Sequence, residues 1–61
     1  MTYDLNYFDA HGMTGTDHSF GFALAKTMAV RAVESGCAVR TEIRDAQGHL
    51  RFTYPRTLRR A

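Results

Sequence analysis

The chain contains one cysteine, one proline and no tryptophan among its 61 residues. A single cysteine excludes an internal disulfide and any zinc site built from several cysteine ligands. No apolar run approaches the ~20 residues needed to cross a membrane, and the N-terminal residues lack the basic-then-apolar pattern of a signal peptide. The sequence therefore predicts a cytoplasmic protein without membrane association, and its low cysteine content fits that reducing compartment.

The composition is typical of one small folded domain, with 44% hydrophobic and 23% charged residues. A domain of this length buries only ~60% of the surface that its unfolded chain exposes, so its core supplies little stability. Self-association or binding to a larger partner would add buried area. We therefore expect a single domain over residues 1–61, with a basic tail over residues 55–61, that binds a protein partner or forms a homodimer.

Positive charge is concentrated in the second half of the chain. Residues 1–30 carry three aspartates and one lysine, a net charge of −2, whereas residues 31–61 carry seven arginines and three acids, a net charge of +4. Arginine pairs in a two-pronged geometry with carboxylates and phosphates. The second half is therefore the predicted location of a binding surface.

The clearest helix is expected over residues 19–35. Asp17 or Ser19 is placed to act as N-cap, and Gly36 occupies the position where helices commonly end in the left-handed conformation. Its apolar face has small residues at the centre and larger ones beside them: Ala25, Ala29 and Ala32, flanked by Phe22, Leu24, Met28 and Val33. Such a face lets the helix approach a sheet closely.

This helix carries more apolar surface than one sheet would cover, since Phe20, Ala23 and Val30 lie outside that face. The face of the helix opposite its sheet contact is therefore a predicted dimer surface. Charged and polar side chains, Lys26 and Arg31 among them, occupy a solvated arc.

Two hairpins are expected to flank the helix. Downstream, a period of two places apolar residues on one face, and the chain turns at Asp45–Gly48 before Pro55 ends the second strand. These apolar positions are Cys37, Val39, Thr41 and Ile43, then Leu50, Phe52 and Tyr54. Upstream, Tyr3, Leu5 and Tyr7 alternate with Asp4, Asn6 and Phe8. A similar turn follows at Asp9–Gly12, and residues 13–18 form either a short polar edge strand or a loose loop. The predicted fold is α+β, with a ββαββ order and one helix packed on a small antiparallel sheet.

No pattern indicates catalysis. Asp9, His11, Asp17 and His18 are close in sequence but lack the spacing of a zinc site, so we predict no metal and no cofactor. Cys37 is interpreted as a small buried apolar residue rather than a nucleophile. The glycines lack the Lys-Ser/Thr ending of a phosphate-binding loop. We expect a non-enzymatic protein.

The arginines of the downstream hairpin and tail are the predicted partner contacts: Arg40, Arg44, Arg51, Arg56, Arg59 and Arg60. Docking on a protein is the favoured interpretation. Nucleic-acid binding is the alternative, but Glu42 interrupts the basic patch and no exposed stacking aromatics are evident. Cross-strand Arg–Glu pairing on a solvated face would explain these residues without any ligand.

The segment from Gly21 to Gly36, followed by a hairpin turning on Asp45–Gly48, resembles small phage and prophage proteins, including anti-CRISPR inhibitors. The similarity covers about residues 20–54 and is one of size and pattern, so no functional position is carried over. It implies a small inhibitor that docks on a larger protein or nucleoprotein complex. Because its acids are dispersed and outnumbered, the chain differs from the acidic DNA mimics among those proteins.

Overall fold

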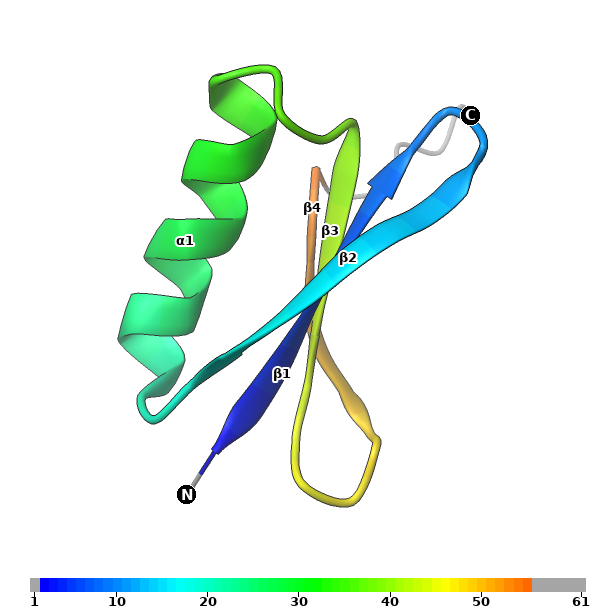
Figure 1. The fold of residues 1–61 in the computed structure, drawn as a ribbon. Coiled ribbons are helices and arrows are strands. Elements are labelled where there is room, and N and C mark those ends of the chain that lie inside the picture. The colour runs from blue at the N-terminus through cyan, green and yellow to red at the C-terminus, as the bar shows by residue number, and fades with distance from the viewer. Residues whose placement is uncertain (1, 56–61) are drawn as a thin grey trace, which may run out of the picture.

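The structure, a computed structural model, describes residues 2–55. Within them the chain forms β1 (Tyr3–Asp9), β2 (Gly12–Ser19), α1 (Phe22–Glu34), β3 (Arg40–Arg44) and β4 (Leu50–Tyr54). The strands form one antiparallel sheet in the order β2-β1-β3-β4, and α1 lies across one face of it (Figure 1). The predicted ββαββ arrangement of the α+β class is confirmed, and residues 13–18 belong to an edge strand.

The two central strands join the two halves of the chain. Leu5 of β1 lies opposite Ile43 of β3, and both side chains are fully buried. Aromatic side chains surround this pair, with the Phe22 ring 5.2 Å from that of Tyr3 and 6.4 Å from that of Phe52 between ring centres. The hydrophobic core is therefore small and depends on contacts between residues far apart in sequence.

α1 begins later than predicted. Asp17 and Ser19 belong to β2, and the N-cap is Gly21, which has extended backbone and offers no side-chain cap. The predicted N-caps are wrong because pairing with β1 continues as far as Ser19, whose hydroxyl instead donates to the Gly21 carbonyl at 3.0 Å. At the other end Ser35 is the C-cap, and Gly36 has a φ of +88°, which confirms its predicted left-handed conformation.

Small residues set the distance between α1 and the sheet. Ala25 and Ala29 are fully buried, and the buried Thr41 hydroxyl lies 3.4 Å from the Ala29 carbonyl oxygen and 3.3 Å from that of Tyr54. This close approach centres α1 over β3 and β1, and β2 receives the least cover. One edge of the sheet is therefore left partly open on the helical side.

The two hairpin turns use the same device, as the repeated pattern predicted. Asp45 Oδ1 accepts hydrogen bonds from the backbone N–H groups two and four residues further on, at 3.0 and 2.9 Å. Asp9 Oδ1 accepts from those two and three residues further on, at 2.7 and 3.1 Å. Each aspartate thus holds its turn through its own backbone, and Gly48 supplies the positive φ of +85°.

Several apolar side chains predicted to be buried are exposed: Leu24, Cys37, Val39 and Leu50. Cys37 and Val39 precede β3, which begins only at Arg40, so they belong to the connection from α1. A register shift in the pairing of β3 with β4 places Leu50 opposite Arg44 rather than over the core. Leu24 lies one helical turn before Met28, at the margin of the apolar face and off the buried line of Ala25 and Ala29.

Candidate functional site

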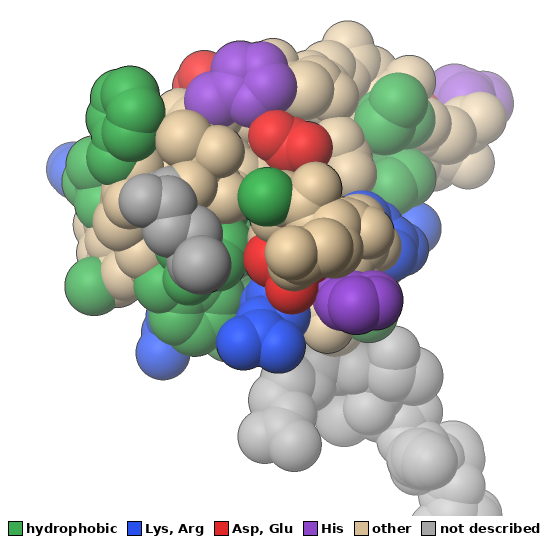
Figure 2. Space-filling model, turned by 90° about the horizontal axis from the view of Figure 1, so that it is seen from below, with side chains coloured by type: hydrophobic (Ala, Val, Ile, Leu, Met, Phe, Trp, Pro, Cys, Tyr) green, Lys and Arg blue, Asp and Glu red, His purple; other side chains and the backbone are tan. Residues whose placement is uncertain are grey.

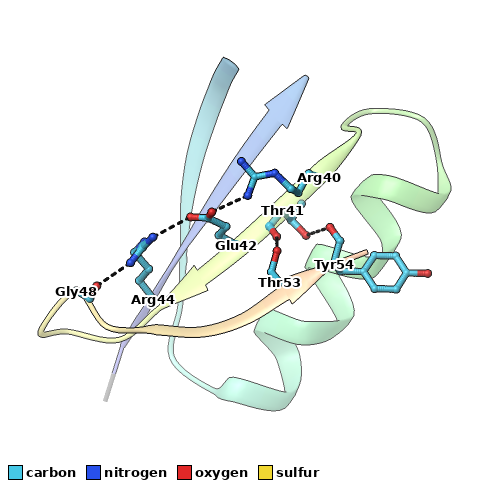
Figure 3. Close-up of polar contacts among 7 residues, drawn as sticks. All are labelled: Arg40, Thr41, Glu42, Arg44, Gly48, Thr53 and Tyr54. Atoms are coloured by element: carbon cyan, nitrogen blue, oxygen red, sulfur yellow. Dashed lines mark hydrogen bonds and ion pairs between the residues drawn. The ribbon is translucent and has the colours of Figure 1, made fainter. Parts of the chain in front are cut away.

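The open sheet face, which is the face opposite α1, carries the predicted contact arginines of β3. Arg40, Glu42 and Arg44 stand in a row, because alternate residues of a strand point to the same side (Figure 3). Glu42 Oε2 accepts from Arg40 Nη1 at 2.6 Å, and Oε1 accepts from Arg44 Nη2 at 3.2 Å. One carboxylate thus holds both guanidinium groups, along one strand rather than across strands as predicted.

Each of these arginines has a second contact within the chain. The Arg40 guanidinium carbon lies 4.0 Å from the centre of the Phe8 ring, a cation–π geometry. Arg44 Nη1 donates to the Gly48 carbonyl at 3.0 Å. Arg51 makes a longer ion pair, with Nε 3.8 Å from Asp45 Oδ2. The structure therefore brings Arg40 and Arg44 together at Glu42, pairs Arg51 with Asp45 at the turn, and engages all three within the chain.

These contacts shift the ionisation of the two acids. Partial burial acts to raise the pKa of the Glu42 carboxyl, but the hydrogen bonds and charges of the two neighbouring arginines outweigh it and lower the pKa overall. Hydrogen bonding from the His49 backbone N–H is the main reason that the pKa of Asp45 is also lowered. Both carboxylates are therefore charged at neutral pH and offset nearby positive charge.

The β1–β2 half of the open sheet face carries the apolar pair Phe8 and Met13 near the turn between the strands and polar side chains beyond it. His18 Nδ1 lies 2.8 Å from Asp4 Oδ1, and Thr16 Oγ1 donates to Asn6 Oδ1 at 2.9 Å. Asp9, His11, Asp17 and His18, which are close in sequence, do not form one cluster. Asp9 holds its own turn, and His11 is exposed at the tip of that turn. Among the described residues no three histidine, cysteine or acidic side chains are grouped closely enough to hold a metal ion.

Charges of both signs are mixed on the surface at the end of the molecule where β1 begins. Figure 2 shows acidic, basic and histidine side chains interspersed there, without one large patch of either sign. Arg56, Arg59 and Arg60, the remaining predicted contacts, lie outside the described residues.

A second surface, the β2–α1 groove, lies on the helical side of the sheet. α1 and β2 meet at their short connection and diverge towards the opposite end (Figure 1). The groove at this wide end has a volume of about 870 Å³, within the usual range of ligand pockets. Its surface is mainly apolar, with Met28 and Ala32 on the helix wall, Tyr7 and Gly15 on the sheet wall, and Cys37 at the connection after α1.

The sheet wall of the β2–α1 groove contains a β-bulge. Tyr7 pairs with Gly15 and Phe8 pairs with Met13, so Thr14 is an extra residue in β2. Gly15 leaves space beside the Tyr7 ring, whose Cδ2 atom lies 3.8 Å from where a Cβ would be. Bulges and strand glycines often mark places where another chain or ligand approaches closely.

Tyr7 gives this wall a neutral polar group. Burial is the main reason that the pKa of the Tyr7 phenol is raised, and the negative charge of Asp17 raises it further. The phenol is therefore uncharged at neutral pH and presents both an apolar ring and a hydroxyl.

Arg31 lines the helix wall of the β2–α1 groove and is the one described lysine or arginine whose side chain has no ion pair, hydrogen bond or ring contact. Sequence reasoning missed it, because a helical wheel places Arg31 on the solvated arc with Lys26. One signal was available: Arg31 follows Met28 by three residues and so adjoins the apolar side of the helix.

The outer side of α1, the predicted dimer surface, has fewer large exposed apolar side chains than expected. The large exposed apolar side chains near the helix gather at its beginning, where Phe20 is 84% and Leu24 57% exposed, while Val30 is half-buried. Leu24 continues the row of Met28 and Ala32 that lines the β2–α1 groove. At Leu24 the surplus apolar surface therefore adjoins the β2–α1 groove rather than the outer side of α1.

No protein-family model, no curated protein and no solved structure matches the chain significantly. Within residues 2–55, no helix has the length and apolar character needed to cross a membrane.

Proposed function

We propose that this chain is a small non-catalytic protein-interaction module that docks on a larger protein through the β2–α1 groove. The observation that carries the proposal is the combination, in one concave surface, of an apolar lining with the side chain of Arg31, which has no partner among the described residues. Aromatic residues, methionine and arginine are the residue types enriched at protein interfaces.

The inhibitor role implied by the anti-CRISPR resemblance is one form of this function. A small phage or mobile-element protein in the cytoplasm would act by occupying a surface that its target, a protein or a nucleoprotein complex, needs. A groove with an exposed rim suits such docking, because the small core leaves apolar surface that only a partner would bury.

Nucleic-acid binding by the open sheet face is the second candidate. The stacking of Arg40 on Phe8 favours it, since it puts an aromatic ring beside a cation on an open sheet. Against it, Glu42 and Asp45 already engage Arg40, Arg44 and Arg51, so phosphates would have to compete with these carboxylates.

Affinity capture from bacterial lysate tests the proposal with three baits: the wild-type chain, Gly15→Val and Thr16→Val. Gly15→Val adds a branched side chain to the sheet wall of the β2–α1 groove, beside the Tyr7 ring. Thr16→Val introduces the same side chain one residue away, on the open sheet face, and serves as the matched control. We expect mass spectrometry to find a protein retained by wild type and Thr16→Val and reduced at least ~10-fold on Gly15→Val, because narrowing a central pocket removes an interface hot spot.

Equal capture by all three baits, or no captured protein, would contradict the proposal. A captured species that is nucleic acid, is lost in moderate salt and is insensitive to Gly15→Val would favour the open sheet face instead.

A further inference from the structure

Resting on the proposed function, we propose that the occupant of the β2–α1 groove is an extended segment of the partner that adds as a strand along the outer edge of β2. One bulky apolar side chain of this segment enters the groove, and a neighbouring Asp or Glu pairs with Arg31. Strand addition gives affinity through backbone hydrogen bonds, and pockets for alternate side chains give specificity.

The edge of β2 is suited to strand addition. β2 is eight residues long, lies at the end of the sheet order and has no other described strand on its outer side. It contains no lysine or proline, and its one bulge, a device that can protect an edge, lies at Thr14, before the regular stretch of residues 15–19. Beyond the bulge at Thr14, residues 15–19 form the regular stretch along which an incoming strand would pair.

The β2–α1 groove adjoins this edge. Residues two apart on an added strand point to the same side, so those on the helical side would project towards the space between β2 and α1. There the apolar lining of Tyr7, Met28 and Ala32 accommodates one large side chain, and Gly15 keeps the entrance clear.

Arg31 favours an acid at one position of the added segment. Glu34, which also lines the β2–α1 groove, and Asp17, which acts on Tyr7, keep their negative charges, but neither pairs with Arg31. Glu34 Oε2 accepts from the Tyr54 hydroxyl at 2.8 Å, and Asp17 Oδ1 accepts from the His18 backbone N–H at 2.8 Å. Arg31, which lines the groove, has no partner within residues 2–55, and a carboxylate is the group that its guanidinium pairs with most specifically.

The test selects peptides from a random display library on the immobilised full chain. We expect enriched sequences with a bulky apolar residue at a fixed spacing from an acid. The affinity of a selected peptide should fall about tenfold on Arg31→Glu and change less than about twofold on Lys26→Glu, a swap of equal charge on another side of the same helix. Replacing the peptide's acid with lysine should restore binding to Arg31→Glu.

Two further measurements locate the peptide. Binding should slow hydrogen exchange at backbone amides of β2, and it should protect Cys37, the chain's single cysteine, from alkylation. Peptides without acid preference, equal binding by Arg31→Glu, or an alkylation rate of Cys37 that does not change would overturn the inference.

The remaining outcomes separate this inference from the proposed function. Lysate capture that depends on Gly15 while no peptide is selected would leave the proposed function standing and overturn the inference, because the partner would then present a folded surface. A dimer that forms with rising concentration and protects Cys37 would assign the β2–α1 groove to a second copy of the chain and also overturn it.

Discussion

The open sheet face and the β2–α1 groove differ in whether their arginines are paired with acids of the chain. On the open sheet face, three arginines lie within reach of two acids, and each guanidinium is engaged by the chain itself. In the groove, one arginine stands beside an apolar lining without a partner among residues 2–55. The two surfaces thus differ in whether their charges have a partner among the described residues, and the proposed function rests on this difference.

The largest effect is expected from a core substitution, because unfolding the chain would abolish both surfaces. Ile43→Ala deletes a fully buried side chain that packs with Leu5 beneath α1, and such changes cost about 2–5 kcal/mol. Since a core of this size supplies only ~3–5 kcal/mol, we expect the variant to be largely unfolded by urea titration at room temperature. Leu50→Ala, which shortens a half-exposed side chain, is the control. If Ile43→Ala were no less stable than Leu50→Ala, the described core would be wrong.

Glu42→Gln tests whether the ion pairs of Arg40 and Arg44 keep the open sheet face from binding nucleic acid. The variant removes the carboxylate that holds Arg40 and Arg44, and we expect it to lose about 1 kcal/mol of stability. It should also gain salt-sensitive retention on a DNA column relative to wild type. Unchanged retention would show that these arginines do not bind phosphate even when released.

The same substitution should weaken the dependence of folding stability on pH. The pKa of Glu42 is lower in the folded chain than its ordinary value, so its stabilising contribution is present above the unfolded pKa and is lost as the pH falls through the folded one. Wild type should therefore lose stability below about pH 4.5 more steeply than Glu42→Gln, as measured by urea unfolding across this range. Parallel curves for the two proteins would contradict the assigned cause of the shift.

Gly15→Val distinguishes the role of the β2–α1 groove in partner binding from its effect on folding stability. Gly15 has extended backbone and space for a Cβ, and glycine within a strand is destabilising by roughly 0.5–1 kcal/mol. We expect the variant to be more stable than wild type by about that amount in thermal or urea unfolding, while partner capture is lost. A destabilised variant would mean that the groove is narrower than described.

The smallest effect is a shift in the titration of one phenol. The pKa of Tyr7 is raised by burial and then by the charge of Asp17, so Asp17→Asn should lower it towards the ordinary value without reaching it. Tyrosine signals followed by NMR through alkaline pH measure this, with Tyr3 in the same spectrum as a reference. A pKa of Tyr7 that does not respond to Asp17→Asn would remove that carboxylate from the surroundings of the groove.

Much of the fold could be predicted from short-range patterns. Alternation in the upstream strand correctly separated Leu5 from Phe8, and the aspartates of both turns were recognised because each bonds to backbone only a few residues away. The N-cap could not be predicted, because Ser19 is held by pairing with Tyr3, a contact that spans the whole upstream hairpin. Cys37 was misplaced for a similar reason, since the start of β3 is set by its partners in β1.

The sequence by itself determined the order of the elements, the face of α1 that meets the sheet and the arginine-rich character of the second half. These follow from local periodicity and composition. Only the tertiary structure decided which of the described arginines lacks a partner in that part of the chain and where a groove opens beside the helix. The physical reason is that Ala25 and Ala29 draw α1 towards β3 and β1, away from β2. The resulting opening depends on the packing of segments far apart in the chain.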